Sequence, residues 1–87
     1  MKLHIRHLLD RHRFTVNVEG HEAFVSYILS GNSLIIDHTF VPKPLKGRGI
    51  ASELVQAAYD YAHENDLICR ATCSYAAAWL DRKSSGN

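Results

Sequence analysis

Apolar and polar residues alternate with a period of two over much of the first half of the chain. The alternation begins at Phe14 and resumes after each of two glycine-containing turn signals. A period of two is typical of strands with one face on a core. The pattern therefore predicts three strands, over residues 14–19, 22–29 and 33–41.

The third of these predicted strands carries apolar residues on both faces, among them Leu34, Ile35 and Ile36. Such a strand is typical of a central position that is covered on both sides. The simplest arrangement is a three-stranded antiparallel meander. Residues 1–13 add a predicted edge strand followed by a turn.

The pattern changes to helical spacing at Ile50. The apolar positions of this stretch are Ile50, Leu54, Ala57, Ala58, Tyr61 and Ala62. A helix of about four turns follows, ending near residues 63–66, where Asn65 suits a left-handed cap. Residues 67–72 predict a short strand, parallel to the third because a helix forms the crossover. Residues 74–82 return to helical spacing and predict a second helix.

The turn before the long helix carries the candidate chemistry. Lys46-Gly47-Arg48-Gly49-Ile50-Ala51 contains two glycines that let the backbone curl and expose its N–H groups. The first N–H groups of a helix lack intrahelical acceptors and lie at its positive end, so this turn is suited to an anion or a phosphate. The alternative is a tight strand-to-helix connection that binds nothing. Neither a nucleotide P-loop nor a G-x-G-x-x-G dinucleotide motif is present in the sequence.

Composition narrows the classes of partner. The 87 residues carry a formal net charge of +1, which gives no overall field toward nucleic acid or anionic membranes. No apolar run approaches the roughly 20 residues that span a bilayer. We expect one domain over residues 1–87, soluble and cytoplasmic, a monomer or at most a weak dimer, without nucleic acid or membrane as a partner.

The two cysteines are expected to be free. Cys69 and Cys73 are four residues apart in an extended stretch and its exit, which places their Cα atoms about 13 Å apart. A disulfide needs them within about 7 Å. The histidines have no spacing with these cysteines that matches a zinc signature, so we expect no metal site.

Three segments together resemble a known family. Lys46-x-x-Gly49-x-Ala51 is similar to the acyl-CoA motif Q/R-x-x-G-x-G/A of the GNAT superfamily of N-acetyltransferases, with lysine in the first position. The run Asp37-His38-Thr39-Phe40-Val41-Pro42 before it and Cys73-Ser74-Tyr75 after it resemble the short, stand-alone YjdJ-type branch. The resemblance extends from about residue 14 to residue 80.

This resemblance implies a fold, a cofactor and a set of contacts. The fold would be a mixed α+β one, with a twisted, mostly antiparallel sheet, a crossover CoA-binding helix and a short C-terminal helix. Acetyl-CoA would enter where two strands splay apart, with its pyrophosphate on the glycine turn and its pantetheine along the end of the third strand. The residues implied as cofactor-binding are Thr39, Phe40, Val41, Lys46, Gly47, Arg48, Gly49, Ile50, Ala51 and Ser52.

Three side chains are candidates for catalysis. Cys73 lies at the start of the last predicted helix, where its thiolate would be favoured and would accept the acetyl group; the alternative is a small, buried apolar residue. His38 has an imidazole suited to take a proton near neutral pH, but it shares a predicted strand face with Leu34, Ile36 and Phe40, so a core histidine is the alternative. Tyr75 would protonate the leaving CoA, as a tyrosine does in larger GNAT enzymes, or pack the helix.

We therefore expect an acetyl-CoA-dependent N-acetyltransferase that acts on an amine, either a protein lysine or a small amine, through direct transfer or through a cysteine. A CoA-binding module without efficient catalysis is the main alternative. A structural or partner-binding domain that has lost the ligand is a third possibility.

Overall fold

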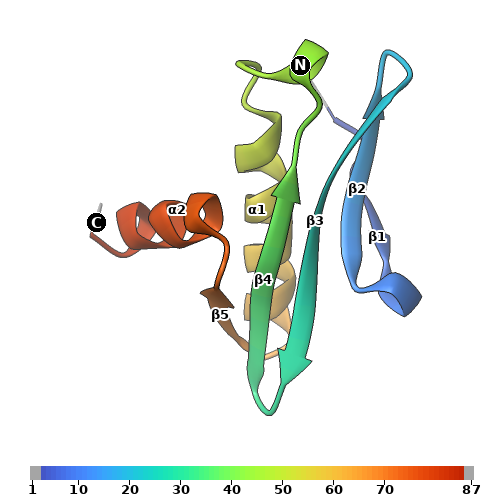
Figure 1. Cartoon of the computed structure of the whole chain (residues 1–87). Coiled ribbons are helices and arrows are strands. Elements are labelled where there is room, and N and C mark those ends of the chain that lie inside the picture. The colour runs from blue at the N-terminus through green and yellow to red at the C-terminus, as the bar shows by residue number, and fades with distance from the viewer. Residues whose placement is uncertain (1–2, 86–87) are drawn as a thin grey trace.

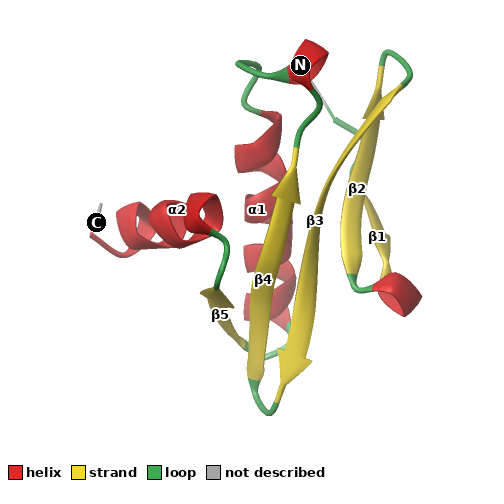
Figure 2. Ribbon diagram, in the orientation of Figure 1, coloured by secondary structure: helices red, strands yellow, loops and turns green. Residues whose placement is uncertain are grey.

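The computed structural model describes residues 3–85, and for residues 84 and 85 the backbone alone. Its elements, in chain order, are β1 (Arg6–Leu8), the 3-10 turn η1 (Leu9–Arg11), β2 (Arg13–Val18), β3 (His21–Ser30), β4 (Ser33–Phe40), the 3-10 turn η2 (Lys43–Leu45), α1 (Ile50–Glu64), β5 (Ile68–Ala71) and α2 (Ser74–Ser85). Figure 2 shows the mixture of strands and helices. The α+β prediction is confirmed, and residues 1 and 2 of the predicted edge segment lie outside the described residues.

The strands form one sheet in the order β1-β2-β3-β4-β5. The first four pair antiparallel, and β5 pairs parallel to β4 after the crossover through α1. Figure 1 shows α1 lying behind the sheet along β4 and β3, with α2 projecting from the β5 side. The predicted meander, the edge strand and the parallel fifth strand are all confirmed.

The hydrophobic core lies between the inner face of the sheet and α1. Val25, Leu34 and Ile36 of the sheet and Leu54 and Ala58 of the helix are fully buried. The helical spacing predicted this contact, since α1 presents one apolar stripe to the sheet. Within the described residues, no helix is long and apolar enough to cross a bilayer.

A β-bulge divides β4 into two halves. Tyr27 of β3 pairs with Ile36 of β4, but the preceding Ser26 pairs with His38, so Asp37 is an extra residue on β4. Because side chains alternate across a strand, one extra residue reverses the faces of everything beyond it. The Ser26 hydroxyl donates a 2.7 Å hydrogen bond to the Asp37 carboxylate at this point.

The bulge corrects two predictions about the third strand. His38 does not share a face with Leu34 and Ile36; it lies on the outer face with Phe40, and both side chains are exposed. Thr39 takes the inner face instead, opposite the buried Val25. The strand is also not covered on both sides, since Phe40 is 49% exposed.

One further prediction at a chain turn was wrong. Asn65 is not the left-handed residue after α1, because its φ is −110° and Asp66 takes φ 57° instead. The Asn65 side chain caps the helix in another way, donating from Nδ2 to the Tyr61 carbonyl at 2.8 Å. After β4 the chain turns at η2, which buries Leu45 completely.

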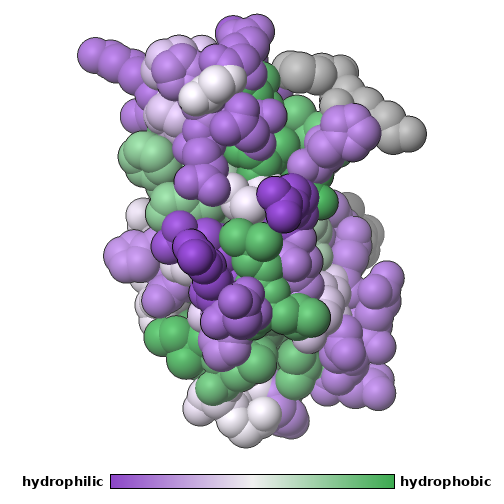
Figure 3. All heavy atoms as spheres, turned by 90° about the vertical axis from the view of Figure 1, so that its right-hand side faces the viewer, coloured by the Kyte–Doolittle hydropathy of each residue, from purple (hydrophilic) through white to green (hydrophobic). Residues whose placement is uncertain are grey.

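The short edge strand β1 is held by aromatic contacts. His7 stacks on Phe14 with ring centroids 4.0 Å apart, and its Nε2 lies 2.7 Å from the Tyr27 hydroxyl. Burial, and to a smaller extent the charge of His12, lower the pKa of His7. Figure 3 shows this β1 and β2 side of the molecule, where hydrophilic residues interrupt the apolar ones.

Candidate active site

The strands β4 and β5 separate at one end of the sheet. Their pairing ends at Ile36 and Ala71, and the Ile36 carbonyl then accepts from the Thr72 N–H at 3.0 Å as the chain turns toward α2. In the described structure β4 continues over residues 37–40 with no partner in β5. An open strand edge leaves backbone N–H and C=O groups for another molecule to pair with.

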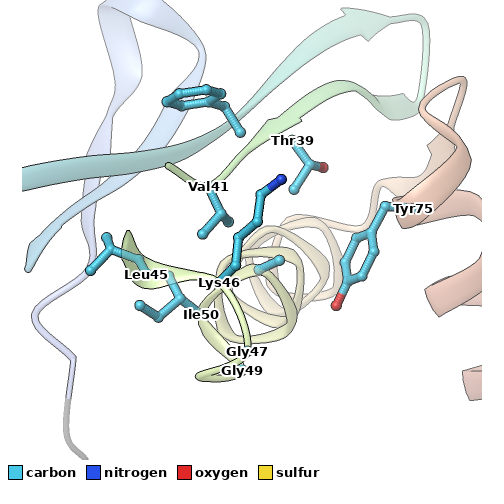
Figure 4. Close-up of a pocket in the computed structure, with 10 residues that line it drawn as sticks. Thr39, Val41, Leu45, Lys46, Gly47, Gly49, Ile50 and Tyr75 are labelled. Carbon is cyan, nitrogen blue, oxygen red and sulfur yellow. The ribbon is translucent and has the colours of Figure 1, made fainter. Parts of the chain in front are cut away.

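A cavity of about 480 Å³ lies beside this open edge. It is bounded by the end of β4, the η2 segment, the first turn of α1 and one side chain of α2. Figure 4 shows Thr39 and Val41 above the start of α1, with Tyr75 of α2 facing them across the cavity. The lining residues are Thr39, Phe40, Val41, Leu45, Lys46, Gly47, Gly49, Ile50, Ala51 and Tyr75.

This cavity brings together eight of the ten residues that the sequence proposed for cofactor binding. Arg48 and Ser52 do not line it. Tyr75, proposed for catalysis, does line it. Leu45 was missed, because a leucine next to a proline-rich turn carries no signal for a pocket until the turn is seen to fold back.

The first turn of α1 presents N–H groups toward the cavity. Gly47 and Gly49 both take positive φ, 83° and 77°, which bends the backbone into the helix. The first hydrogen bond of the helix runs from the Glu53 N–H to the Gly49 carbonyl at 3.2 Å. The N–H groups of residues 50–52 therefore precede the intrahelical ladder and face a possible anion at the positive end of the helix.

The two basic side chains of this turn, Lys46 and Arg48, point in different directions. Lys46 extends from the turn toward Thr39 (Figure 4). Arg48 points away and pairs with Glu19 of the β2–β3 hairpin, with N···O distances of 3.2 and 3.3 Å. This ion pair joins two residues that are 29 positions apart in the sequence, so Arg48 is held away from the cavity.

Cys73 lies immediately next to the cavity. It precedes α2, and its Sγ is 3.4 Å from the Thr39 Oγ1 of the cavity wall. Burial alone would raise its pKa, but hydrogen bonds from the Thr39 side chain and from the Ala76 and Tyr75 amides outweigh burial, so the pKa lies below its ordinary value. A thiol of this kind is reactive at lower pH than an ordinary cysteine.

The other cysteine has the opposite character. Burial raises the pKa of Cys69 to about 11. Both cysteines are free, as the spacing predicted. Cys69 therefore stays protonated near neutral pH, and Cys73 is the thiol of this structure that is prepared for ionisation.

His38 is separated from these groups by the strand itself. It lies on the outer face of β4, opposite Ser26, whereas Thr39 and its contact Cys73 lie on the inner side. A molecule that contacts His38 must approach from the outer face. The structure thus unites Cys73, Thr39 and Tyr75 on one side and leaves His38 on the other side of the same open strand edge.

The chain is similar to one protein family over most of its length. The family described as GCN5-related N-acetyl-transferase matches residues 13–86. Protein NATD1 from Gallus gallus is 38% identical over 81 residues, covering 90% of this chain and 74% of that protein. NATD1 from Homo sapiens is also 38% identical, covering 90% and 72%. The NMR solution structure of a GCN5-like protein from Staphylococcus aureus superimposes with a TM-score of 0.74 at 30% identity, covering 95% of this chain and 82% of that one.

Proposed function

The chain belongs to the GCN5-related N-acetyltransferase family and is therefore an acyltransferase, and we propose that it transfers the acetyl group of acetyl-CoA to an amine at the cavity beside β4. One observation carries the proposal: the cavity joins an unpaired strand edge to the positive end of a helix. Acetyl-CoA has a peptide-like arm and a pyrophosphate, which are the two chemical features that such a cavity would bind.

The first turn of α1 would hold the pyrophosphate. The N–H groups of residues 50–52 are its donors, and Lys46 adds a positive charge from the cavity wall. A Cβ placed on Gly47 or Gly49 would meet nothing within 4 Å, so there is open space for phosphate oxygens to approach the backbone. The pantetheine amides would pair with the edge of β4 over residues 39–41, which supplies the strand-like hydrogen bonds that β5 does not.

Acetyl-CoA is consumed as the acetyl donor, so the chemistry depends on the chain's own groups at the end of the cavity. In the covalent route, the Cys73 thiolate attacks the thioester carbonyl, its new C–S bond replaces the bond to the CoA sulfur, and Tyr75 protonates the departing thiolate. The acceptor amine then attacks the acetyl-cysteine and releases the Cys73 thiolate. Tyr75 regains its proton from solvent.

The acceptor would bind at the open edge of β4, where its nitrogen can reach the thioester on the inner side while His38 contacts it from the outer face. The imidazole of His38 would take the proton that the attacking nitrogen loses. In the direct route the same amine attacks the thioester without an acetyl-cysteine, and Cys73 or Tyr75 supplies the proton to CoA. The acceptor class that we propose is a protein lysine or a small amine. The lowered pKa of Cys73 favours the covalent route.

We further propose that residues 1–87 act as one domain, because one core cluster joins the sheet to both helices. Two free thiols are consistent with the reducing cytoplasm. The second candidate, a CoA-binding module with little turnover, is favoured by one feature: around His38 the sheet face is open, with Phe40 49% exposed. A wide, shallow surface positions an amine less firmly than a pocket does.

An amide NMR titration with acetyl-CoA tests the cofactor site. We expect shifts concentrated at residues 39–41 and 46–52, reaching residue 73, and small shifts at the β3–β4 turn near Gly31, which serves as an internal control. Turnover with a panel of amines then separates the enzyme from the binding module. An absence of shifts at millimolar acetyl-CoA would refute the proposed site.

Mass spectrometry distinguishes the two routes. Incubation with acetyl-CoA without an amine should add one acetyl group at Cys73, and Cys73→Ala should abolish the adduct, while Cys69→Ala should keep it. Full activity in Cys73→Ala would refute the covalent route and leave direct transfer as the mechanism.

A further inference from the structure

A second cavity lies where α1 and α2 meet. Its volume is about 310 Å³, and the described residues that line it are Ser52 of α1 and Trp79, Arg82 and Lys83 of α2. None of these four side chains is acidic, and two of them are cations. The function proposed above makes no use of this cavity.

The walls of this cavity are held in place by packing between the helices. The Trp79 indole N–H donates a 2.9 Å hydrogen bond to the Ser52 hydroxyl oxygen. The Lys83 ammonium lies 5.5 Å from the Trp79 ring centre and 5.4 Å from that of Tyr59, a cation–π arrangement. It also approaches the Gln56 side-chain oxygen at 3.5 Å. The positive charge of Lys83 is thus held against the Tyr59 and Trp79 rings.

The residues that line the second cavity lie farther along both helices than those that line the first. On α1, Ala51 lines the larger cavity and the next residue, Ser52, lines the smaller. On α2, Tyr75 lines the larger and Trp79, one helical turn later, lines the smaller. The two cavities are thus lined by neighbouring positions on each helix, which is the arrangement that one extended ligand would need in order to reach both.

Ser52 connects the two cavities chemically. Its backbone N–H is the last donor before the intrahelical ladder of α1 begins. Its hydroxyl oxygen already accepts from Trp79, so the hydroxyl proton remains available as a donor. A phosphate bound in the second cavity beside Ser52 would therefore meet a hydroxyl donor and the two cations of α2.

We propose that the Ser52–Trp79–Arg82–Lys83 cavity binds the 3′-phosphate on the ribose of CoA, and so makes the protein selective for 3′-phosphorylated CoA over dephospho-CoA. The inference rests on the proposed function. In CoA a single ribose separates the pyrophosphate from the 3′-phosphate, so a pyrophosphate on the first turn of α1 places the second phosphate next to Ser52. Arg82 forms the planar, two-pronged contact that suits a phosphate dianion.

The test compares CoA with dephospho-CoA, which differ by this phosphate alone. The chain contains one tryptophan, so the intrinsic fluorescence of Trp79 reports directly from the cavity, and calorimetry gives the affinity. We expect CoA to bind at least tenfold more tightly than dephospho-CoA, with the difference shrinking as salt is raised.

The variant Arg82→Gln should remove most of this preference. CoA affinity should fall by about tenfold, while dephospho-CoA affinity should change by less than about twofold. Arg11→Gln is the matched control, because it removes the same charge from an exposed position on the η1 turn. It should leave both affinities unchanged.

Several results would overturn the inference. Equal binding of CoA and dephospho-CoA by the wild type would refute the phosphate site while leaving the acetyl-CoA site intact. An equal loss for both ligands in Arg82→Gln would show a general charge effect and also refute it. If inorganic phosphate changes Trp79 fluorescence as strongly as CoA does and CoA keeps no advantage, the cavity takes free phosphate. If neither nucleotide binds, the proposed function fails together with this inference.

Discussion

The phosphate site that we propose at the start of α1 is tested most directly at Gly49. This residue has φ 77° and is exposed, and a Cβ added to it would have no other atom within 4 Å. Gly49→Ala should therefore cost stability through backbone conformation alone, about 1 to 2 kcal/mol. Gly49→Glu should cost a similar amount of stability, because its side chain has room to extend.

The two variants should differ in ligand affinity. Two unit charges about 4 Å apart repel by about 1 kcal/mol in water and by about 4 kcal/mol at an effective dielectric constant of 20. The new carboxylate is exposed and flexible, so we take the lower figure for each of two pyrophosphate charges. The expected loss is about 2 kcal/mol, or roughly thirtyfold in the dissociation constant, relative to Gly49→Ala.

Gly31 provides the control. It lies in the β3–β4 turn with φ 57° and also has nothing within 4 Å of an added Cβ. Gly31→Ala and Gly31→Glu should reproduce the stability cost, measured by urea unfolding, without the affinity loss, measured by calorimetry with acetyl-CoA. If Gly49→Glu binds acetyl-CoA as tightly as Gly49→Ala, the pyrophosphate does not lie at this turn and the argument is wrong.

Three further predictions concern the thiol, the edge strand and the core. Thr39→Val removes a hydrogen bond that lowers the pKa of Cys73, so the pH profile of its alkylation should move to higher pH, with Cys69 unreactive in both proteins; an unmoved profile would contradict the assigned cause. The pKa of His7 is lowered by burial from 6.5, so the unfolded chain takes up that proton first, and urea-measured stability should fall as pH drops below about 6.5; His7→Phe should lose part of this dependence, and an unchanged slope would count against it. Leu54→Ala empties a fully buried site and should cost about 2 to 5 kcal/mol of unfolding free energy, whereas a loss under about 1 kcal/mol would show that the core readily collapses around it.

The sequence predicted the order and type of the main strands and helices, because their apolar positions follow periods of 2 and 3.6. It failed at Asp37, where no turn residue or change in composition signals an added residue. Every face assignment beyond that point was reversed, which turned His38 from a possible core residue into an exposed one. A bulge depends on the register of the partner strand, and a single-strand pattern contains no information about register.

The sequence predicted the backbone segments of the cavity but not the long-range side-chain contacts around it. Those segments follow from the glycine turn, and the resemblance to a family supplied the residues of β4. The contacts between distant side chains were not predictable, since Trp79 reaches Ser52 across 27 positions and Arg48 reaches Glu19 across 29. Such pairs depend on how helices and hairpins pack, which local spacing does not encode.

The four residues of β4 that extend beyond its pairing with β5 also affect how the protein behaves without a bound ligand. An unpaired strand edge is a template onto which the edge of another chain can add, and sheet proteins commonly protect such edges. Here the protecting strand would be the ligand itself. Acetyl-CoA would then act as a detachable piece of the sheet, and its cellular concentration would set how much of the chain is kept from pairing with its own copies.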